Sequence, residues 1–363
     1  MILITNKVRR EDWFSHKLLS LAGLVYQEKL SEFCCPTLEI SLVPSFVSLN
    51  YRNDKGSKNI FINTIKVRGT ITKMFKYVVD SLYSYILISR SKDNAVLFYN
   101  VDAHNIVLVY CLIYLSRKKC VAVIADNSFV SWGFFSKLCN YAISRLDGVI
   151  VLNNTVVNNS NSVLMPGLLR NVDFKSPVKK RITPITLFSG SLGKTTGFEI
   201  CLETMVSMPE ITLNVSGRPY FYSDDDFSAI LEKYSGNKNI VFHGILSEHQ
   251  YADLLSSADI AFSLRNPDDL EHDHNFPSKI LEYLAAGKMV ISTKKYGFIP
   301  EGILFYTAYS CEGIGSMVGK LLLYSESQVY AHQQRVLEFL KSNCSKKVFQ
   351  TNLRLLVGSN ETT

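Results

Sequence analysis

Short apolar runs alternate with amphipathic stretches along almost the whole chain. The runs are rich in Val, Ile and Leu without strict alternation, which is typical of strands covered on both faces of a parallel sheet. The expected strands are Ile2–Thr5, Ala95–Tyr99, Cys120–Ala125, Val149–Leu152, Ile185–Phe188, Ile211–Val215, Asn239–Phe242, Ile260–Ser263 and Met289–Ser292. The amphipathic stretches between them include Ser131–Arg145, Phe198–Ser207, Ser247–Ser257 and Ser278–Ala286. This order predicts an α/β fold of βαβ units with parallel sheets.

The apolar periodicity lapses between Pro166 and Arg181, where Pro, Gly and basic residues gather. A chain of 363 residues is too long for one compact core and suits two domains. We therefore expect an N-terminal domain over residues 1–175 and a C-terminal domain over residues 176–340. The last helical pattern, roughly Ser327–Val357, predicts that the tail, residues 341–363, packs back on the N-terminal domain.

Composition excludes several classes of protein. Apolar residues make up 47% of the chain and charged residues 20%, which is typical of a folded protein with an ample core. The eight cysteines form no Cys-x-x-Cys pair and no cluster with histidine, so reduced thiols are expected rather than disulfides or a zinc site. The longest apolar run, Ile106–Leu115, is shorter than the roughly 20 residues of a membrane helix. A cytoplasmic protein is therefore predicted.

The positive charge lies in the first half of the chain. Residues 1–180 carry 23 Lys and Arg against 12 Asp and Glu, a net charge of +11, whereas the remainder carries −4. Between residues 52 and 92, basic residues interleave with aromatic and aliphatic ones. This pattern predicts a basic amphipathic helix, and such a helix can lie on the anionic inner face of a membrane. The alternative is an ordinary surface helix whose lysines extend along apolar neighbours.

The stretch "FSGSLGKTTG" (Phe188–Gly197) resembles a phosphate-binding loop. A Walker A motif requires a glycine at the position of Phe188, but Gly190, Gly193, Lys194 and Thr195 still satisfy a looser variant. Parallel sheets bind ligands at the carboxyl ends of their strands. The other strand-to-helix turns of this half are Gly217-Arg218-Pro219 and Leu264–Pro277.

The second of these turns leads into the helix Ser278–Ala286. Ser278 is expected to cap this helix, with the N–H groups and the positive dipole end directed at the preceding loop. That arrangement suits an anion such as a pyrophosphate, and Lys279 adds a charge beside it. Glu282 could accept hydrogen bonds from two ribose hydroxyls. Its alternative is an exposed glutamate that merely favours the helix dipole.

Two segments carry a family resemblance. "NFPSKILEYLAAGKMVIST" (Asn275–Thr293) and "NIVFHGILSEHQYADLLSSADIAFSL" (Asn239–Leu264) resemble the nucleotide-sugar-binding part of bacterial GT-B glycosyltransferases of the glycosyltransferase 4 (group 1) type. The resemblance covers most of residues 185–295, and the first half matches only in outline. It implies two Rossmann-like domains with parallel sheets facing across a cleft. It also implies sugar transfer from a nucleoside-diphosphate sugar without a bound metal.

Residue by residue, the resemblance makes Glu282 the second glutamate of a Glu-x7-Glu motif that binds the ribose. The first glutamate is replaced by His274, with Glu271 and Asp273 as nearby substitutes. Further donor-binding positions are Gly190, Ser191 in place of an arginine, Gly217, Pro277, Ser278 and Lys279. Lys194, Arg218 or Arg265 would supply the missing cation for the departing diphosphate.

In the first half, two positions follow expected strands. The resemblance suggests that His104 touches the donor sugar, although Asp102 and His104 also suit a helix cap beside a surface histidine. Asp126 is a candidate for acceptor contact or, in an inverting enzyme, for a base, and a simple turn residue is its alternative. Asp224-Asp-Asp226 is expected to be a solvated loop rather than a metal site.

These features predict a hexosyltransferase, of retaining type, for bacterial surface polysaccharides such as O-antigen, capsule or exopolysaccharide. Its partners would be a nucleoside-diphosphate sugar and a saccharide acceptor, lipid-linked at the inner leaflet, with peripheral contact with anionic membrane and no nucleic acid. No cofactor is expected. One alternative is a non-catalytic GT-B protein that binds nucleotide sugars, because His274 replaces a glutamate. Another is an ATPase that uses Lys194, and a GT-B sugar epimerase is a further one.

Overall fold

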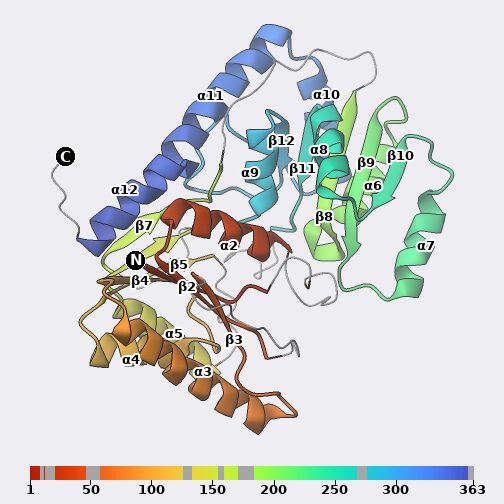
Figure 1. Cartoon of the computed structure of the whole chain (residues 1–363). Helices are drawn as coiled ribbons and strands as arrows, with labels where there is room; N and C mark the ends of the chain where they lie inside the picture. Colours follow the sequence, from red (N-terminus) through yellow and green to blue (C-terminus); the bar gives the residue numbers. More distant parts are fainter. Residues whose placement is uncertain are drawn as a thin grey trace. The chain divides into compact units, whose positions relative to one another are not determined.

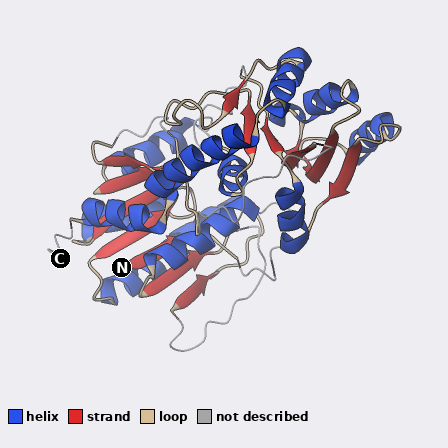
Figure 2. Cartoon of the chain, turned by 90° about the horizontal axis from the view of Figure 1, so that it is seen from above, coloured by secondary structure: helices blue, strands red, loops and turns tan. Residues whose placement is uncertain are grey.

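The computed structural model describes residues 1–8, 12, 21–45, 58–125, 133–153, 159–170, 184–267 and 276–358. The chain divides into two compact units, Met1–Arg170 with Cys344–Thr363, and Asn171–Asn343. Each unit contains a parallel sheet with helices on both faces (Figures 1 and 2). The predicted α/β fold class is confirmed. No helix of the described residues is long and apolar enough to cross a bilayer.

The described strands of the first unit form one parallel sheet in the order β3-β2-β1-β4-β5-β6-β7. They are β1 (Ile2–Thr5), β2 (Leu38–Leu42), β3 (Asn59–Ile62), β4 (Ala95–Tyr99), β5 (Lys119–Ile124), β6 (Gly148–Val151) and β7 (Ser162–Leu164). The described helices of this unit are α2 (Leu21–Cys34), α3 (Thr70–Arg90), α4 (Ile106–Leu115), α5 (Gly133–Ser144) and α12 (Lys346–Val357).

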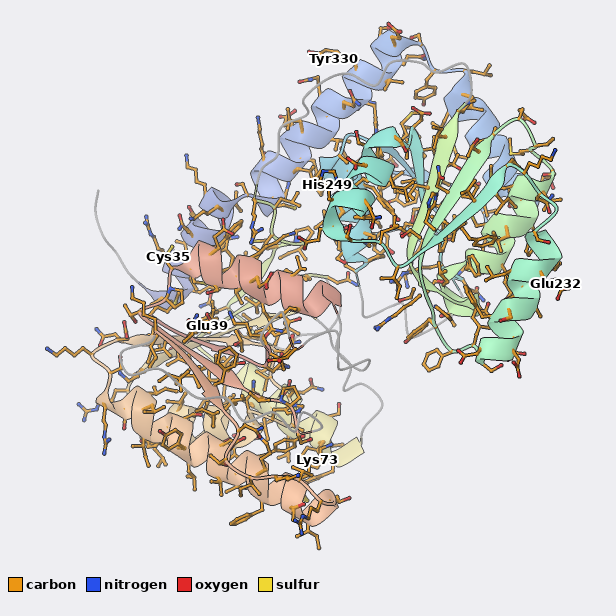
Figure 3. The ribbon with its side chains drawn as sticks, turned by 45° about the vertical axis from the view of Figure 1, so that its right-hand side comes forward. Cys35, Glu39, Lys73, Glu232, His249 and Tyr330 are labelled. Carbon is orange, nitrogen blue, oxygen red and sulfur yellow. The ribbon has the colours of Figure 1, made fainter. Side chains whose placement is uncertain are left out.

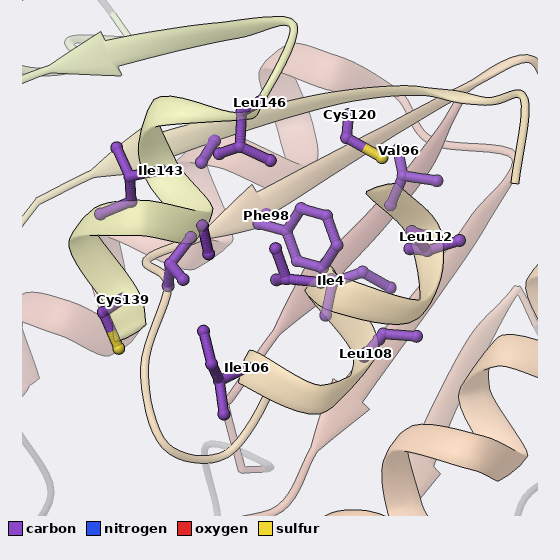
Figure 4. Close-up of a cluster of buried hydrophobic side chains, with 14 of the residues drawn as sticks. Ile4, Val96, Phe98, Ile106, Leu108, Leu112, Cys120, Cys139, Ile143 and Leu146 are labelled. Atoms are coloured by element: carbon purple, nitrogen blue, oxygen red, sulfur yellow. The ribbon is translucent and has the colours of Figure 1, made fainter. Parts of the chain in front are cut away.

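Alternate residues of these strands pack on opposite faces of the sheet, as the period of a strand requires. Ile4 and Phe98 join a core with side chains of α4 and α5 (Figure 4). Leu3 and Leu97 join the other core, which α2 and α12 cover. Because both faces are buried, the strands β1 and β4 are continuous apolar runs, and this is why their positions were predictable.

The helix α12 belongs to the first unit although it comes last in the sequence. Phe349 lies 6.1 Å from Phe33 between ring centroids, and Gln350 Nε2 donates to the Phe33 carbonyl at 3.0 Å. The predicted single helical pattern is in fact two helices, α11 (Glu326–Cys344) and α12. They are separated at Ser345, whose hydroxyl caps α12 by accepting from the Val348 N–H at 3.4 Å.

The described strands of the second unit form a parallel sheet in the order β10-β9-β8-β11-β12-β13. They are β8 (Ile185–Leu192), β9 (Thr212–Pro219), β10 (Ile240–Gly244), β11 (Ile260–Ser263), β12 (Met289–Ser292) and β13 (Phe305–Tyr306). The described helices of this unit are α6 (Phe198–Val206), α7 (Asp224–Tyr234), α8 (Glu248–Ser257), α9 (Ser278–Ala285), α10 (Cys311–Leu322) and α11. Phe198 and Leu202 of α6 pack with Ile314 of α10 in its core.

Some elements were not predicted, because charged residues within them interrupt the apolar pattern. The strand β2 contains a buried glutamate, Glu39, which pairs with Lys7 Nζ at 2.6 Å and accepts from Ser31 Oγ at 2.8 Å. An acidic residue within a short apolar run weakens the strand pattern. Asp224–Asp226 was expected in a loop, but these exposed residues form the first turn of α7, where carboxylates favour the helix dipole.

His332 of α11 is completely buried and makes the stability of the second unit pH-dependent. Its Nδ1–H donates to the Gly302 carbonyl at 3.0 Å, and its ring lies 4.8 Å from that of Phe305. Burial lowers the pKa of His332 to about 4. The unfolded state therefore binds a proton as the pH falls below about 6.5, whereas the folded state resists it until about 4.

We expect the free energy of unfolding of the second unit to fall by about 2 kcal/mol between about pH 7 and about pH 5. Urea unfolding of the whole chain at each pH measures this loss. In the variant His332→Asn, this pH-dependent loss of stability should largely disappear. His249 is an exposed histidine of α8, so the variant His249→Asn should lose stability as the unmodified chain does. An equal loss in His332→Asn and in the unmodified chain would contradict the assignment.

Candidate functional site

Two glycines face each other where the strands β8 and β9 approach their carboxyl ends. Gly190 pairs with Gly217, and both have positive φ, 125° and 153°. A Cβ built on Gly217 would lie 1.8 Å from the Gly190 carbonyl oxygen, so only glycine permits this contact. The sequence suggested that the turn begins at Gly190. Instead β8 continues to Leu192, because β9 pairs with it as far as Pro219.

The turn after β8 is short and internally bonded. Lys194–Thr196 form a single 3₁₀ turn before α6. Thr196 Oγ1 accepts from the Gly193 N–H at 3.0 Å and contacts the Ser191 carbonyl at 2.8 Å. Ser191 and Lys194 are exposed. Arg218 lies opposite Ser191 in the strand pair, so a cation stands beside the position where the resemblance expects one.

The helix α9 begins beside Gly190. Ser278 was expected to be its cap, but the structure places Pro277 there and Ser278 in the first turn. Proline has no side-chain acceptor, so the first N–H groups of α9 receive no side-chain cap hydrogen bond. Lys279 Cγ lies 3.9 Å from where a Cβ on Gly190 would be. An uncapped helix start and a lysine thus border the glycine pair.

A hydrogen-bonded network of five residues extends from this point along α9 and α8. Lys279 Nζ lies 2.8 Å from Glu282 Oε2 and 4.2 Å from the centroid of the Tyr251 ring. The Tyr251 hydroxyl is 3.1 Å from Ser189 Oγ and donates to Glu282 Oε2 at 3.5 Å. The Tyr283 hydroxyl lies 2.9 Å from Ser189 Oγ and donates to the Ser189 carbonyl at 3.2 Å. The network ties the charged pair to the end of β8.

Both tyrosines of the network stay protonated at neutral pH. Burial raises the pKa of Tyr251, and the nearby Glu282 carboxylate raises it further. Burial likewise raises the pKa of Tyr283, which is completely buried. Each hydroxyl therefore remains available as a donor to a carboxylate or a carbonyl. The side chains of Lys279 and Glu282 remain about one-third exposed, so a ligand can reach them.

Arg265 lies just after the carboxyl end of β11, in a loop held by two hydrogen bonds to Thr293. Its N–H donates to Thr293 Oγ1 at 2.7 Å, and the same hydroxyl donates to the Arg265 carbonyl at 2.7 Å. Thr293 directly follows β12, so the two neighbouring strand ends are joined. Arg265 also lies close enough to Tyr296 to counter in part the rise that burial causes in the tyrosine's pKa.

In the first unit, Asp102 and His104 form a pair after β4. Asp102 Oδ1 accepts from the His104 N–H at 2.8 Å and lies 3.3 Å from its Nδ1, while Asn6 Nδ2 donates to Oδ2 at 3.4 Å. The His104 ring lies 4.7 Å from the Tyr77 ring. Among the described residues, no partner bonds to its buried Nε2. One ring nitrogen is thus oriented by a carboxylate, while the other is buried and makes no hydrogen bond to the part of the chain that the structure describes.

The electrostatics of this pair favour an ionised Asp102. Burial alone would raise the pKa of this carboxyl, but the His104 side chain and the N–H groups of His104 and Asn105 outweigh burial and lower it. A carboxylate on Nδ1 sets the tautomer in which Nε2 is the unprotonated acceptor. His104 Nε2 can then accept a hydrogen bond from a hydroxyl group.

Apart from His104, the predicted site residues fall into three groups. In the second unit Gly190, Gly217, Lys279 and Glu282 lie close together, with Pro277 and Ser278 at the start of the same helix. Ser191, Lys194, Arg218 and Arg265 lie at strand ends of the same sheet. Asp126 and His274, together with Glu271 and Asp273, lie outside the described residues.

Sequence reasoning missed three members of the network, Ser189, Tyr251 and Tyr283. Tyr283 stands within "SKILEYLAAG", next to Glu282, so its position in the motif was a usable signal. Tyr251 has no local signal, because an aromatic residue in an amphipathic helix is most often a packing residue.

Comparison with known proteins agrees with this architecture. Residues 170–305 match the family model of glycosyl transferases group 1. No curated protein matches the chain by sequence. Among solved structures, a glycosyltransferase from Rickettsia africae ESF-5 is similar with a TM-score of 0.70 at 14% identity, covering 99% of each chain.

Two further similar structures are synthases. The UDP-forming α,α-trehalose-phosphate synthase of Burkholderia xenovorans, in complex with glucose-6-phosphate, has a TM-score of 0.65 at 9% identity, covering 98% of this chain and 99% of that one. Sucrose-phosphate synthase of Thermosynechococcus elongatus has a TM-score of 0.65 at 11% identity, covering 99% of each chain. The predicted GT-B architecture of two Rossmann-like domains and the resemblance to group 1 glycosyltransferases are confirmed.

Proposed function

We propose that this protein is a glycosyltransferase that moves a sugar from a nucleoside-diphosphate sugar to a saccharide acceptor. The observation that carries the proposal is the Lys279–Glu282 pair, held by Tyr251 and Ser189 beside the glycine pair of β8 and β9. A cation and a carboxylate three residues apart on one helix match the two polar parts of a nucleoside diphosphate, its phosphates and its ribose diol.

The diphosphate would lie at the start of α9. The uncapped N–H groups and the positive end of the helix dipole attract an anion, and Lys279 adds a full charge. Gly190 lets the backbone of β8 approach the phosphates. Arg218, opposite Ser191, would replace the arginine that the resemblance expects at position 191. These cations would stabilise the departing diphosphate, so we propose no bound metal.

Glu282 would bind the ribose. A carboxylate has two oxygens and accepts paired hydrogen bonds from neighbouring hydroxyls. Tyr251 fixes one of these oxygens and contacts Lys279 with its ring. His104 would contact the donor sugar, as the resemblance suggests. A retaining reaction would need no side-chain base, because the leaving phosphate can take the acceptor proton.

We propose the class of acceptor from the positive charge of the first half of the chain. The first half carries a net +11, which suits a lipid-pyrophosphate-linked saccharide at an anionic membrane surface and a place in surface polysaccharide assembly. In this proposal the protein works in the cytoplasm, in peripheral contact with the inner face of the membrane. A UDP-sugar is the first donor to test, since a similar structure is a UDP-forming synthase.

Calorimetric titration with UDP, GDP, ADP and their sugars, followed by transfer of labelled sugar, tests this function. We expect one nucleotide series to bind, and Glu282→Gln to weaken that binding about tenfold to 100-fold, because a charged hydrogen-bond acceptor is lost. Glu312→Gln, an exposed glutamate in the first turn of α10, is the matched control and should bind normally.

The alternatives give different results. Nucleotide-sugar binding without transfer to any acceptor would favour the non-catalytic protein. ATP hydrolysis that is lost in Lys194→Ala would favour the ATPase. If no nucleotide binds, the proposal is wrong.

A further inference from the structure

The helix α3 is oriented opposite to the usual amphipathic helix. Its outward face carries an apolar stripe from Ile71 to Ile86, which consists of Ile71, Met74, Phe75, Val78, Leu82 and Ile86. These positions repeat at three- and four-residue intervals and therefore form one stripe. Ile71 is 84% exposed, Phe75 61% and Leu82 47%. We call this stripe the α3 face.

The inward side of α3 is polar over most of its length, and only near its end does an apolar residue, Ile88, enter the core. Lys76 and Asp80 are buried and paired with each other, and Lys76 Nζ also donates to the Val43 carbonyl at 3.1 Å. Asp80 accepts from the Thr64 N–H at 3.1 Å. The Tyr77 hydroxyl lies 2.9 Å from Ser45 Oγ. The helix is thus anchored by polar contacts to the loops after β2 and β3.

The residues of the α3 face therefore lie outside the core of the first unit, to which α3 contributes Ile88, with Tyr85 and Leu87 packed against it. Exposed apolar residues scattered singly need no explanation, but a continuous stripe on one helix marks an interaction surface. On α4 and α5 of the same unit, large side chains are also exposed, namely those of Tyr114, Leu115, Phe134 and Tyr141. The two tyrosines contact each other through hydroxyls 3.1 Å apart.

The charge around the α3 face is positive. The sequences of α3, α4 and α5 contain one acidic residue, Asp80, and it is buried against Lys76. Exposed cations lie on or beside these helices at Lys66, Arg68, Lys73, Arg90, Lys92, Arg117, Lys137 and Arg145. Figure 3 shows Lys73 near the start of α3. A second copy of the chain would bring a like-charged surface, so self-association through this face is disfavoured.

We propose that the α3 face is the part of this protein that lies on an anionic lipid bilayer. The inference deepens the membrane contact proposed above and does not depend on the transfer reaction. The helix spans about 30 Å, and its stripe would enter the boundary between headgroups and acyl chains. Lys66, Arg68 and Lys73 at one end and Arg90 and Lys92 at the other would meet anionic headgroups.

This placement has a consequence for the candidate site. Tyr77 projects from the inward side of α3 and contacts His104, so the histidine is separated from the bilayer by about the diameter of one helix, roughly 10 Å. The donor sugar that His104 is proposed to contact would therefore lie near the membrane surface, within reach of an acceptor saccharide attached to a lipid.

Vesicle flotation of the full chain, with no nucleotide sugar present, tests the surface. We expect binding to phosphatidylcholine vesicles that contain phosphatidylglycerol, little binding to phosphatidylcholine alone, and weaker binding as salt increases. Phe75→Gln and Leu82→Gln should each weaken binding about tenfold, because an apolar side chain no longer enters the lipid. Both residues are exposed, so folding should be unaffected.

Matched controls come from the opposite side of the same unit. Leu355→Gln changes a 70% exposed leucine of α12 and should bind vesicles normally. Lys73→Gln should weaken binding to anionic vesicles, whereas Lys347→Gln on α12 should not. With a lipid-linked acceptor in vesicles, Phe75→Gln should lower kcat/KM, while transfer to a water-soluble acceptor should be unchanged.

Three results would overturn the proposal. One is that the unmodified chain binds neither kind of vesicle. The second is that the double variant Phe75→Gln/Leu82→Gln binds as the unmodified chain does. The third is that the unmodified chain sediments as a dimer and the double variant as a monomer, which would assign the α3 face to contact with a second copy. Vesicle flotation needs no nucleotide sugar, so it tests the α3 face even if no sugar transfer is detected.

Discussion

Replacing Lys279 with methionine should lower kcat/KM for sugar transfer about 100-fold or more. The length and packing of the side chain are largely preserved, and only the charge is lost. This charge stands at the start of α9, where the developing negative charge of the leaving diphosphate would need compensation. Loss of one preorganised donor at such a position typically has an effect of this size.

The surroundings of Lys279 fix its position in advance. Its ammonium group is held over the Tyr251 ring and against Glu282, and its stem passes beside Gly190. Because the lysine is already ordered, little entropy is lost when phosphates bind. The loss should therefore appear both in nucleotide binding, measured by calorimetry, and in kcat.

Lys320→Met is the control, since it removes an exposed lysine from α10 of the same unit. It should leave transfer unchanged. If Lys279→Met retains kcat/KM within a factor of about two, the diphosphate does not bind at the start of α9. Unfolding curves of both variants exclude a general loss of structure.

The parts of the site that could be predicted are those with a local pattern. The helix α9 follows from the periodicity of Ser278–Ala285, and β12 follows from a continuous apolar run. Lys279 and Glu282 were identified because they lie at the start of that helix, where a pattern in a few residues fixes the geometry.

The parts that could not be predicted depend on pairings between distant segments. Ser189 and Tyr283 are 94 residues apart, and Tyr251 joins them from a third element. Nothing in the neighbourhood of any one of these residues indicates the other two. Their contact follows from the strand order β9-β8-β11-β12, which places α8 and α9 beside the end of β8.

The helix α3 illustrates a different limit. Its periodicity predicts an amphipathic helix, but periodicity alone does not tell which face is buried. The usual rule would place Phe75 and Leu82 inside. The structure buries Lys76 and Asp80 instead, because the loops after β2 and β3 supply their hydrogen-bonding partners.

Gly217→Ala should destabilise the second unit by about 3 kcal/mol and remove nucleotide binding. The added methyl would lie 1.8 Å from the Gly190 carbonyl oxygen, and a φ of 153° disfavours any side chain. The strands β8 and β9 would have to separate where the phosphates are proposed to bind. Urea unfolding measures the first effect and calorimetry with the bound nucleotide the second.

Alanine variants of two other glycines of the same unit should have smaller effects on the free energy of unfolding and serve as comparisons. Gly236→Ala adds a methyl into open space and should change the free energy of unfolding by less than about 0.5 kcal/mol. Gly190→Ala meets only Lys279 Cγ, at 3.9 Å, so its effect should be intermediate and should come from its positive φ. If all three variants unfold alike, the close approach of β8 and β9 is not what requires Gly217. If Gly217→Ala is destabilised yet binds nucleotide normally, the glycine pair serves the fold alone, and the phosphates bind elsewhere.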